Sequence, residues 1–240
     1  MVKLLKRIYF GFIQRLKKFK YSLSKNDIYI LMFHDVCSVE NSDPKINISN
    51  NNFRDFINEL RCHNVKFVGI DEISLNTKCQ KFVITFDDVY EGAVLNAIPL
   101  LTEWNIPFTL FISPCLIDRE GYIMSSQIEE LKNNRLCTIG FHTKNHKLMR
   151  ELYDTEIKNE IDCVDFEKQY GIKCEYFAYP YGSVFACSNS NIEVLEKSKY
   201  KAAFGTINSG TNVTLIERHK YYIPRLNICD ETFLKFLGRH

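Results

Sequence analysis

The sequence predicts an α/β domain in which parallel strands alternate with helices. Short apolar and β-branched runs, such as residues 82–86 and 108–112, show no polar alternation. This is typical of strands buried on both faces of a parallel sheet. Segments with helix signals lie between these runs, and no long linker or internal repeat interrupts the alternation. Such alternation favours parallel strands joined by right-handed crossovers.

The expected elements follow from local signals along the chain. Strands are predicted over residues 28–33, 66–68, 82–86, 108–112, 138–141, 176–179, 202–204 and 221–223, and a helical turn over 70–75. Helices are predicted over 49–63 with Ser49 as the N-cap, 92–105 ended before Pro107, 125–133 with Ser125 as the N-cap, 154–170 ended at Gly171, 192–198 and 231–237.

Size and composition limit the class of protein. The chain has 240 residues and 45% hydrophobic content, enough for one sizeable core. Its formal net charge is only +2, so bulk charge does not indicate a nucleic-acid partner. The 9 cysteines are scattered singly, and no stretch has the length of a membrane span or the form of a signal peptide. We therefore expect reduced thiols and a cytoplasmic location.

The N-terminal segment differs from the rest of the chain in charge. Residues 1–25 contain eight lysines or arginines and no acidic residue, which leaves the remainder with a formal charge of −6. Apolar and basic side chains recur at helical spacing over residues 2–20 and predict a basic amphipathic helix. Such a helix either contacts an anionic membrane surface or docks on the domain or a partner. We therefore divide the chain into this helix, residues 1–25, and one barrel domain, residues 26–240.

Two motifs that follow apolar strands carry candidate metal ligands. Asp87 and Asp88 come directly after residues 82–86, and His142 and His146 follow the strand predicted over 138–141. Carboxylates at the end of a buried strand are costly unless a cation or a proton compensates them. One carboxylate and two imidazoles make a three-ligand site typical of a catalytic zinc that activates water. The alternatives are a strand end or helix N-cap for the aspartates and a surface position for the histidines.

His34 occupies a similar position after the first predicted strand. Polar groups at the carboxyl ends of successive parallel strands lie on the face where (β/α) barrels build active sites. His34 is therefore either functional or a histidine whose hydrogen bonds are satisfied in the core.

Together the motifs resemble those of the polysaccharide deacetylase family of carbohydrate esterases. Residues 85–88, Thr-Phe-Asp-Asp, are similar to the family's first motif, and residues 142–146 to its His-Ser/Thr-x-x-His motif. Residues 179–182, Tyr-Pro-Tyr-Gly, are similar to its third motif, and the correspondence runs in order across residues 28–226. The resemblance implies a distorted (β/α)7 barrel and a divalent metal, commonly zinc.

The resemblance also implies a role for each matching residue. Asp87 would be the general base, Asp88, His142 and His146 would bind the metal, and Tyr179, Pro180, Tyr181 and Gly182 would border the substrate pocket, with a backbone amide near Tyr181 holding the oxyanion.

Three positions depart from the family pattern. Val89 stands where the first motif normally has glycine. Ala178 replaces the arginine of the third motif. Arg225 would supply that positive charge beside the base and the substrate. The alternative is that Arg225 forms a surface salt bridge. The C-terminal Leu-x-His motif is missing, and residues 32–35, Met-Phe-His-Asp, resemble it at the front of the chain. Circularly rearranged members similar to the poly-N-acetylglucosamine deacetylases share this arrangement, which assigns His34 as the general acid.

These expectations combine into a metal-dependent hydrolase that removes an acetyl group from an N-acetylated sugar, in a glycan or a glycan precursor. The alternatives are a hydrolase of a non-sugar amide or an O-acetyl ester on the same fold, and a non-catalytic membrane-associated binding module. A lipid-linked or nucleotide-linked substrate at the inner membrane face would reconcile a cytoplasmic enzyme with peripheral membrane contact through residues 2–20.

Overall fold

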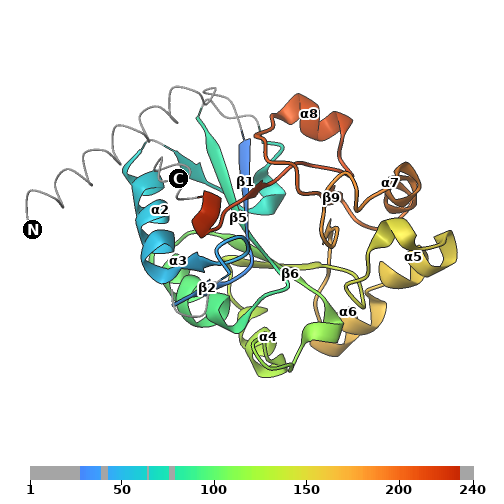
Figure 1. The fold of residues 1–240 in the computed structure, drawn as a ribbon, viewed down its shortest axis with the longest axis horizontal. Helices are drawn as coiled ribbons and strands as arrows, with labels where there is room; N and C mark the ends of the chain where they lie inside the picture. Colours follow the sequence, from blue (N-terminus) through green and yellow to red (C-terminus); the bar gives the residue numbers. More distant parts are fainter. Residues whose placement is uncertain (1–27, 39–42, 64, 76–78, 233–240) are drawn as a thin grey trace, which may run out of the picture.

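The computed structural model describes residues 28–38, 43–63, 65–75 and 79–232 and has the predicted α/β architecture (Figure 1). Each pair of neighbouring strands in this part of the chain is parallel, as the alternation of strands and helices predicted. The basic helix expected over residues 2–20 and the boundary between residues 25 and 26 lie outside the described residues. Both stay predictions.

The central sheet places the first and last of the described strands, β1 and β10, side by side. Within the described residues its strand order is β10-β1-β5-β6-β7-β8-β9, with β4 paired to β5 beside this path, while β2 and β3 form a separate pair. The strands are β1 Ile28–Phe33, β2 Val36–Cys37, β3 Ile48–Ser49, β4 Lys66–Phe67, β5 Lys81–Asp87, β6 Phe108–Ile112, β7 Cys137–Phe141, β8 Tyr176–Ala178, β9 Ala202–Phe204 and β10 Leu226–Asn227.

One short segment brings the two ends of this path together. Ile223 forms a parallel bridge with Phe204 of β9, and its N–H donates to the Ala203 carbonyl at 2.9 Å. Shortly afterwards Leu226 of β10 pairs with Leu31 of β1. Residues 223–227 therefore contact strands at both ends of the path, which gives the sheet the shape of a distorted barrel.

Helices surround the strands, with α2 and α3 on one side and α5 and α7 on the opposite side (Figure 1). The α-helices are α2 Asn50–Cys62, α3 Ile98–Glu103, α4 Ser125–Leu131, α5 Asp154–Glu160, α6 Val164–Tyr170, α7 Asn189–Glu196 and α8 Val213–Arg218. The π-helix η3 covers Ala93–Ala97, and the 3₁₀ helices are η2 Ile70–Glu72, η4 Pro114–Leu116 and η5 Met149–Glu151. Ser49 caps α2 as predicted, since its side chain accepts a hydrogen bond from the Asn52 N–H.

The prediction of one continuous helix over residues 154–170 is wrong. In such a helix the Glu160 carbonyl would accept the N–H of Val164. It instead accepts the N–H of Lys144 at 2.9 Å, and the Val164 N–H donates to Oδ1 of Asp162 at 3.1 Å. The chain therefore forms two helices, α5 and α6, and the second ends at Gly171 in the left-handed conformation, as predicted.

Smaller differences also have local causes. Met124 is the N-cap of α4, because the N–H of the predicted cap, Ser125, donates to Asp118 at 2.7 Å. The strand expected over 221–223 is reduced to one parallel bridge at Ile223, because Tyr222 closes a turn by donating its N–H to the His219 carbonyl. The last strand among the described residues is β10. The segment expected as one helix over 92–105 begins with the π-helix η3. The helix expected over 192–198 corresponds to α7, which begins at Asn189, and α8 was not predicted. The helix expected over 231–237 lies mostly outside the described residues.

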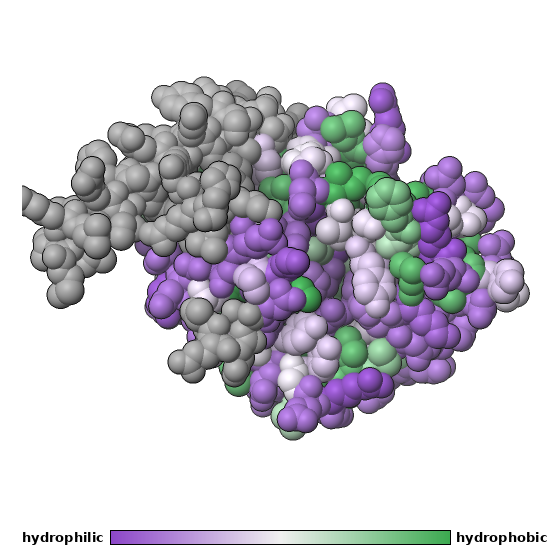
Figure 2. Space-filling model, viewed as in Figure 1, coloured by the Kyte–Doolittle hydropathy of each residue, from purple (hydrophilic) through white to green (hydrophobic). Residues whose placement is uncertain are grey.

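The core supports the strands that carry the predicted site. β1, β5 and β6 are buried along their whole length. Phe33 of β1 packs edge-on against Phe53 of α2, with ring centroids 5.1 Å apart. Figure 2 shows the surface of the molecule seen from the side of Figure 1. Hydrophilic side chains lie along much of its outer edge, and apolar side chains lie nearer its middle. Over the described ranges, none of the helices combines the length and apolar character needed to cross a membrane.

Candidate active site

The carboxyl ends of three parallel strands bring the predicted polar residues to one cavity. His34 follows β1, Asp87 is the last residue of β5, and His142 follows β7. A cavity of about 480 Å³ is lined by Met32, His34, Lys45, Ile46, Asp87, Asp88, Tyr90, Leu116, Tyr122, His142, His146, Tyr181, Thr206 and Asn227. The position of this cavity agrees with the expectation for the strand ends of a (β/α) barrel.

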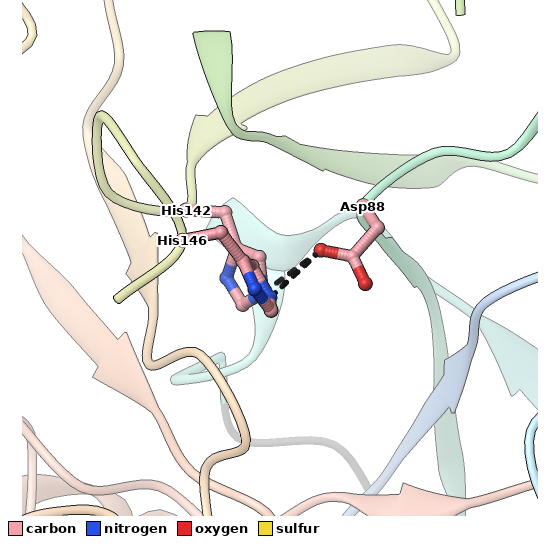
Figure 3. Close-up of side chains that lie close together, drawn as sticks. All are labelled: Asp88, His142 and His146. Carbon is pink, nitrogen blue, oxygen red and sulfur yellow. Dashed lines mark ion pairs between the residues drawn. The ribbon is translucent and has the colours of Figure 1, made fainter. Parts of the chain in front are cut away.

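Asp88, His142 and His146 point toward one another within this cavity (Figure 3). Oδ1 of Asp88 lies 3.0 Å from Nε2 of His146 and 3.5 Å from Nε2 of His142. The ligand atoms of the three residues all lie within 4.8 Å of one another. Oδ1 is buried and accepts no well-directed hydrogen bond in the described part of the chain, despite these close nitrogens. The atoms therefore face a common point, as ligands of one cation would.

Two features prepare these side chains for a cation. The Nδ1 of His142 lies 2.8 Å from the Ala178 carbonyl, and donation there leaves the lone pair of Nε2 directed at the cluster. Burial opposes ionisation of Asp88, but His146 and His142 outweigh it and lower the pKa of Asp88 to about 2. An ionised carboxylate and two imidazoles, with room for a further ligand in the cavity, fit a divalent ion such as zinc.

The backbone around the cluster is strained. Asp88 and Val89 have φ of 60° and 54°, and Thr143 and His146 have φ of 63° and 51°. A β-branched residue with positive φ is unusual, and Val89 occupies the position where the resembling motif has glycine. The conformation that glycine normally provides is thus kept here without glycine. Strain of this kind persists where surrounding contacts determine the backbone, often beside functional groups.

Asp87 and Arg225 form a buried ion pair beside the cluster. The guanidinium donates to both carboxylate oxygens of Asp87 at 2.6 Å, and it also donates to Oγ1 of Thr85 at 3.3 Å and to the Gly205 carbonyl at 3.1 Å. Arg225 is 0% exposed, so this is not the surface salt bridge of the alternative interpretation. Burial alone would raise the pKa of Asp87, but Arg225, with His142 and His34, holds it below its usual range.

His34 lines the same cavity, near both aspartates. Its positive form would lower the pKa of Asp87 and of Asp88, although Arg225 and His146 act on them more strongly. Its Nδ1 is buried and has no hydrogen-bond partner among the described residues. Nδ1 therefore lacks the hydrogen bond expected of a histidine that is satisfied in the core.

The residues of the third motif divide between the cavity and the core. Only Tyr181 of the four lines the cavity; it is 62% exposed, and its ring packs edge-on against His146 with centroids 5.0 Å apart. Tyr179 is 0% exposed and donates its hydroxyl to the Tyr221 carbonyl at 2.9 Å, so it does not border the cavity as expected. Pro180, Gly182 and Arg225 also do not line the cavity, and Arg225 lies behind Asp87.

Sequence reasoning missed part of the opposite wall. Tyr90 and Tyr122 stack with ring centroids 4.6 Å apart, and a backbone bridge joins these two positions. Lys45 and Asn227 also line the cavity. Tyr122, Lys45 and Asn227 belong to none of the motifs. Lys45 and Tyr122 lie outside the named helices and strands, and Asn227 ends the short strand β10, so no sequence pattern points to these residues.

A second group of metal-type ligands, Cys163, Glu167 and Cys174, lies away from this cavity. Here Glu167 is already engaged by Lys199 and by the Cys174 N–H, which donates to it at 2.7 Å. Both thiols are buried. None of the three lines the cavity that holds the other polar groups, so Asp88, His142 and His146 are the better candidates for a catalytic metal.

Comparisons with known proteins show the family of the chain. The family model of the polysaccharide deacetylases matches residues 74–209. A poly-beta-1,6-N-acetyl-D-glucosamine N-deacetylase of Staphylococcus aureus is 27% identical over 212 residues, covering 80% of this chain and 71% of that protein. The corresponding protein of Staphylococcus epidermidis is 22% identical over 249 residues, covering 90% and 83%.

Solved structures share the fold. IcaB from Ammonifex degensii superposes with a TM-score of 0.71 at 20% identity, covering 89% of this chain and 97% of that one. The deacetylase PplD of Streptococcus pyogenes superposes with a TM-score of 0.74 at 20% identity, covering 89% and 99%.

Proposed function

Because the chain belongs to the polysaccharide deacetylase family, as its motifs predicted, we propose that it removes acetyl groups from N-acetylated glucosamine units of a polysaccharide. The observation that carries this proposal is the convergence of Asp88, His142 and His146 beside the buried Asp87–Arg225 pair. A metal-ligand set next to a separate ionised carboxylate supplies what amide hydrolysis by an activated water requires.

Zinc is the metal we propose for the three ligands, since two imidazoles and one carboxylate with an open position are typical of catalytic zinc. When bound, such an ion polarises the acetamide carbonyl and lowers the pKa of water. The proposed role of Asp88, His142 and His146 is to hold it. The ring of Tyr181 packs edge-on against His146 beside this proposed metal site.

The remaining roles concern protons and the developing charge. Asp87 is the proposed general base: its lowered pKa keeps it ionised at neutral pH, and Arg225 fixes both of its oxygens in position. His34 is the proposed general acid, which gives a proton to the leaving amine. A backbone N–H near Tyr181 is the proposed donor to the oxygen that becomes negative. Asp87 and His34 both line the cavity, in agreement with direct contact with the substrate.

The proposed substrate rests on relatives and on the walls of the cavity. The curated relatives are named as deacetylases of poly-beta-1,6-N-acetyl-D-glucosamine. In this chain the exposed Tyr181 and the stacked Tyr90–Tyr122 pair line the cavity that holds the metal ligands. Aromatic faces of this kind suit the apolar faces of sugar rings.

The test is release of acetate by the full chain. The protein is stripped with a chelator, reloaded with Zn²⁺, and incubated with β-1,6-linked N-acetylglucosamine oligomers, a nucleotide-linked N-acetylglucosamine, an O-acetylated sugar and a simple N-acetyl amide. We expect metal-dependent acetate release from the oligomers, and none from an Asp88→Ala variant. Faster acetate release from the ester or the simple amide would contradict the proposed substrate and favour one of those compounds instead. No acetate release from any compound would favour a binding module.

A further inference from the structure

A buried carboxylate lies behind the loop that carries the two histidine ligands. Glu160, the last residue of α5, is 1% exposed, although carboxylates are rarely buried without partners. Its Oε2 accepts the backbone N–H of Asn145 at 2.8 Å, and its Oε1 accepts the side-chain amide of Asn145, also at 2.8 Å. Its nearest described cation is Lys147, whose exposed ammonium lies 3.6 Å from Oε1.

The main chain of Glu160 contacts the same loop. Its carbonyl accepts the Lys144 N–H at 2.9 Å, the hydrogen bond that ends α5 and divides the predicted helix. Lys144 and Asn145 are two of the three residues between His142 and His146. Every hydrogen bond that the structure gives Glu160 outside its own helix therefore ends on the segment that joins the two proposed ligands.

The opposite side of the loop is held by residues that follow β6. Oγ of Ser113 donates to the Thr143 carbonyl at 2.8 Å, and the Cys115 N–H donates to the Lys144 carbonyl at 3.1 Å. The loop needs such support because Thr143 and His146 have positive φ, which disfavours their backbone conformation in an unrestrained chain.

We infer that Glu160 is a positioning residue that fixes the geometry of His142 and His146 by holding Asn145. This inference rests on the metal site proposed above, and it assigns Glu160 no contact with metal or substrate. Partners that orient metal ligands typically change metal affinity about 10- to 100-fold when they are removed. Because Glu160 contacts the loop and not the cavity, we expect its removal to loosen metal binding in a protein that still folds.

The amide–carboxylate geometry permits a reciprocal exchange. In Glu160→Gln, one oxygen still accepts the Asn145 N–H, and the new amide can donate to a rotated Asn145 side chain, so this variant should behave like the natural protein. In Asn145→Asp, two carboxylates face each other, and the loop should be displaced. In Asn145→Asp/Glu160→Gln, the new amide can donate to the new carboxylate, and the contact should return. Glu160→Met removes the acceptors. Glu156→Met is the control for a general weakening of α5, because Glu156 is exposed and, within the described part of the chain, its side chain accepts only the Tyr153 N–H at the start of that helix, away from the loop.

Two measurements on the full chain test the inference: the dissociation constant for Zn²⁺ against a competing chelator, and hydrogen exchange of residues 142–146 in metal-free protein. We expect Glu160→Met and Asn145→Asp to bind Zn²⁺ about 10- to 100-fold more weakly and to exchange faster. Glu160→Gln, Glu156→Met and the double variant should stay within roughly threefold of the natural protein.

If Glu160→Met does not fold, Asn145→Asp and Asn145→Asp/Glu160→Gln still test the inference. Asn145 is exposed, so its replacement should not prevent folding. The inference is overturned if Asn145→Asp binds Zn²⁺ and exchanges its amide hydrogens like the natural protein. It is also overturned if the double variant is as impaired as Asn145→Asp alone. Failure of the natural protein to bind Zn²⁺ would instead refute the metal site, while the exchange data would still report on Glu160.

Discussion

Replacement of Arg225 by alanine tests the most demanding feature of the proposed site. The substitution removes two hydrogen bonds of 2.6 Å to Asp87 and leaves a carboxylate that is 3% exposed without its guanidinium partner. Breaking a buried ion pair by removing one partner costs about 3–5 kcal/mol, because the remaining charge stays buried. We therefore expect a loss of that size in the free energy of unfolding, measured by urea denaturation at pH 7.

The same change should alter the pH dependence of catalysis. Arg225 is the largest influence that lowers the pKa of Asp87, and burial, which raises it, would then act with less opposition. In the natural protein the folded pKa lies below the unfolded value of about 3.9, so the stabilisation is present above that pH and disappears as the pH falls through the folded pKa. In Arg225→Ala the pKa rises, and the acidic limb of the kcat/KM profile should move to higher pH.

A double-mutant cycle separates this explanation from simple loss of packing. In an Asp87→Asn background the carboxylate that pairs with Arg225 is absent, so Arg225→Ala should cost markedly less stability than in the natural protein. Arg225→Lys should be intermediate, since it keeps the charge but not the paired donors. Arg218→Ala, an exposed arginine of α8, is the control. Equal losses in both backgrounds, or unchanged turnover in Arg225→Ala, would refute the reasoning.

The remaining predictions address the other parts of the site. Asp88→Ala should lose bound Zn²⁺ after dialysis, measured by elemental analysis, and retention of a full equivalent would exclude it as a ligand. His34→Ala should lose most acetate release while keeping its metal; loss of metal would make His34 a ligand instead. Tyr181→Ala should raise KM for oligomers by about 2- to 12-fold, the range of aromatic contact energies, with metal content unchanged, and an unaltered KM would remove it from the substrate contacts. Gly92→Ala should lower the free energy of unfolding, measured with urea, by about 1–3 kcal/mol, because its Cβ would overlap the side chain of Asp35. A smaller loss would mean that Asp35 moves aside easily.

The sequence by itself determined the parts of this protein that local pattern records. Buried parallel strands are continuous apolar runs, so residues 28–33 and 108–112 were placed to the residue, and those polar residues that follow such runs necessarily meet at one edge. Asp88, His142 and His146 were found in this way. Family motifs then suggested their roles, which await the experiments above.

Only the tertiary structure decided which distant groups meet. Arg225 and Asp87 are 138 residues apart, and local sequence could not tell a surface arginine from one with 0% exposure beneath the site. The helical pattern of residues 154–170 was correct on both sides of the break between α5 and α6. The break depends on the Lys144 N–H, which donates to the Glu160 carbonyl from a separate segment of the chain. Tyr179 was likewise turned into the core by its contact with the Tyr221 carbonyl. Local propensity describes a segment's own backbone and amphipathic face, whereas such contacts depend on how separate segments pack together.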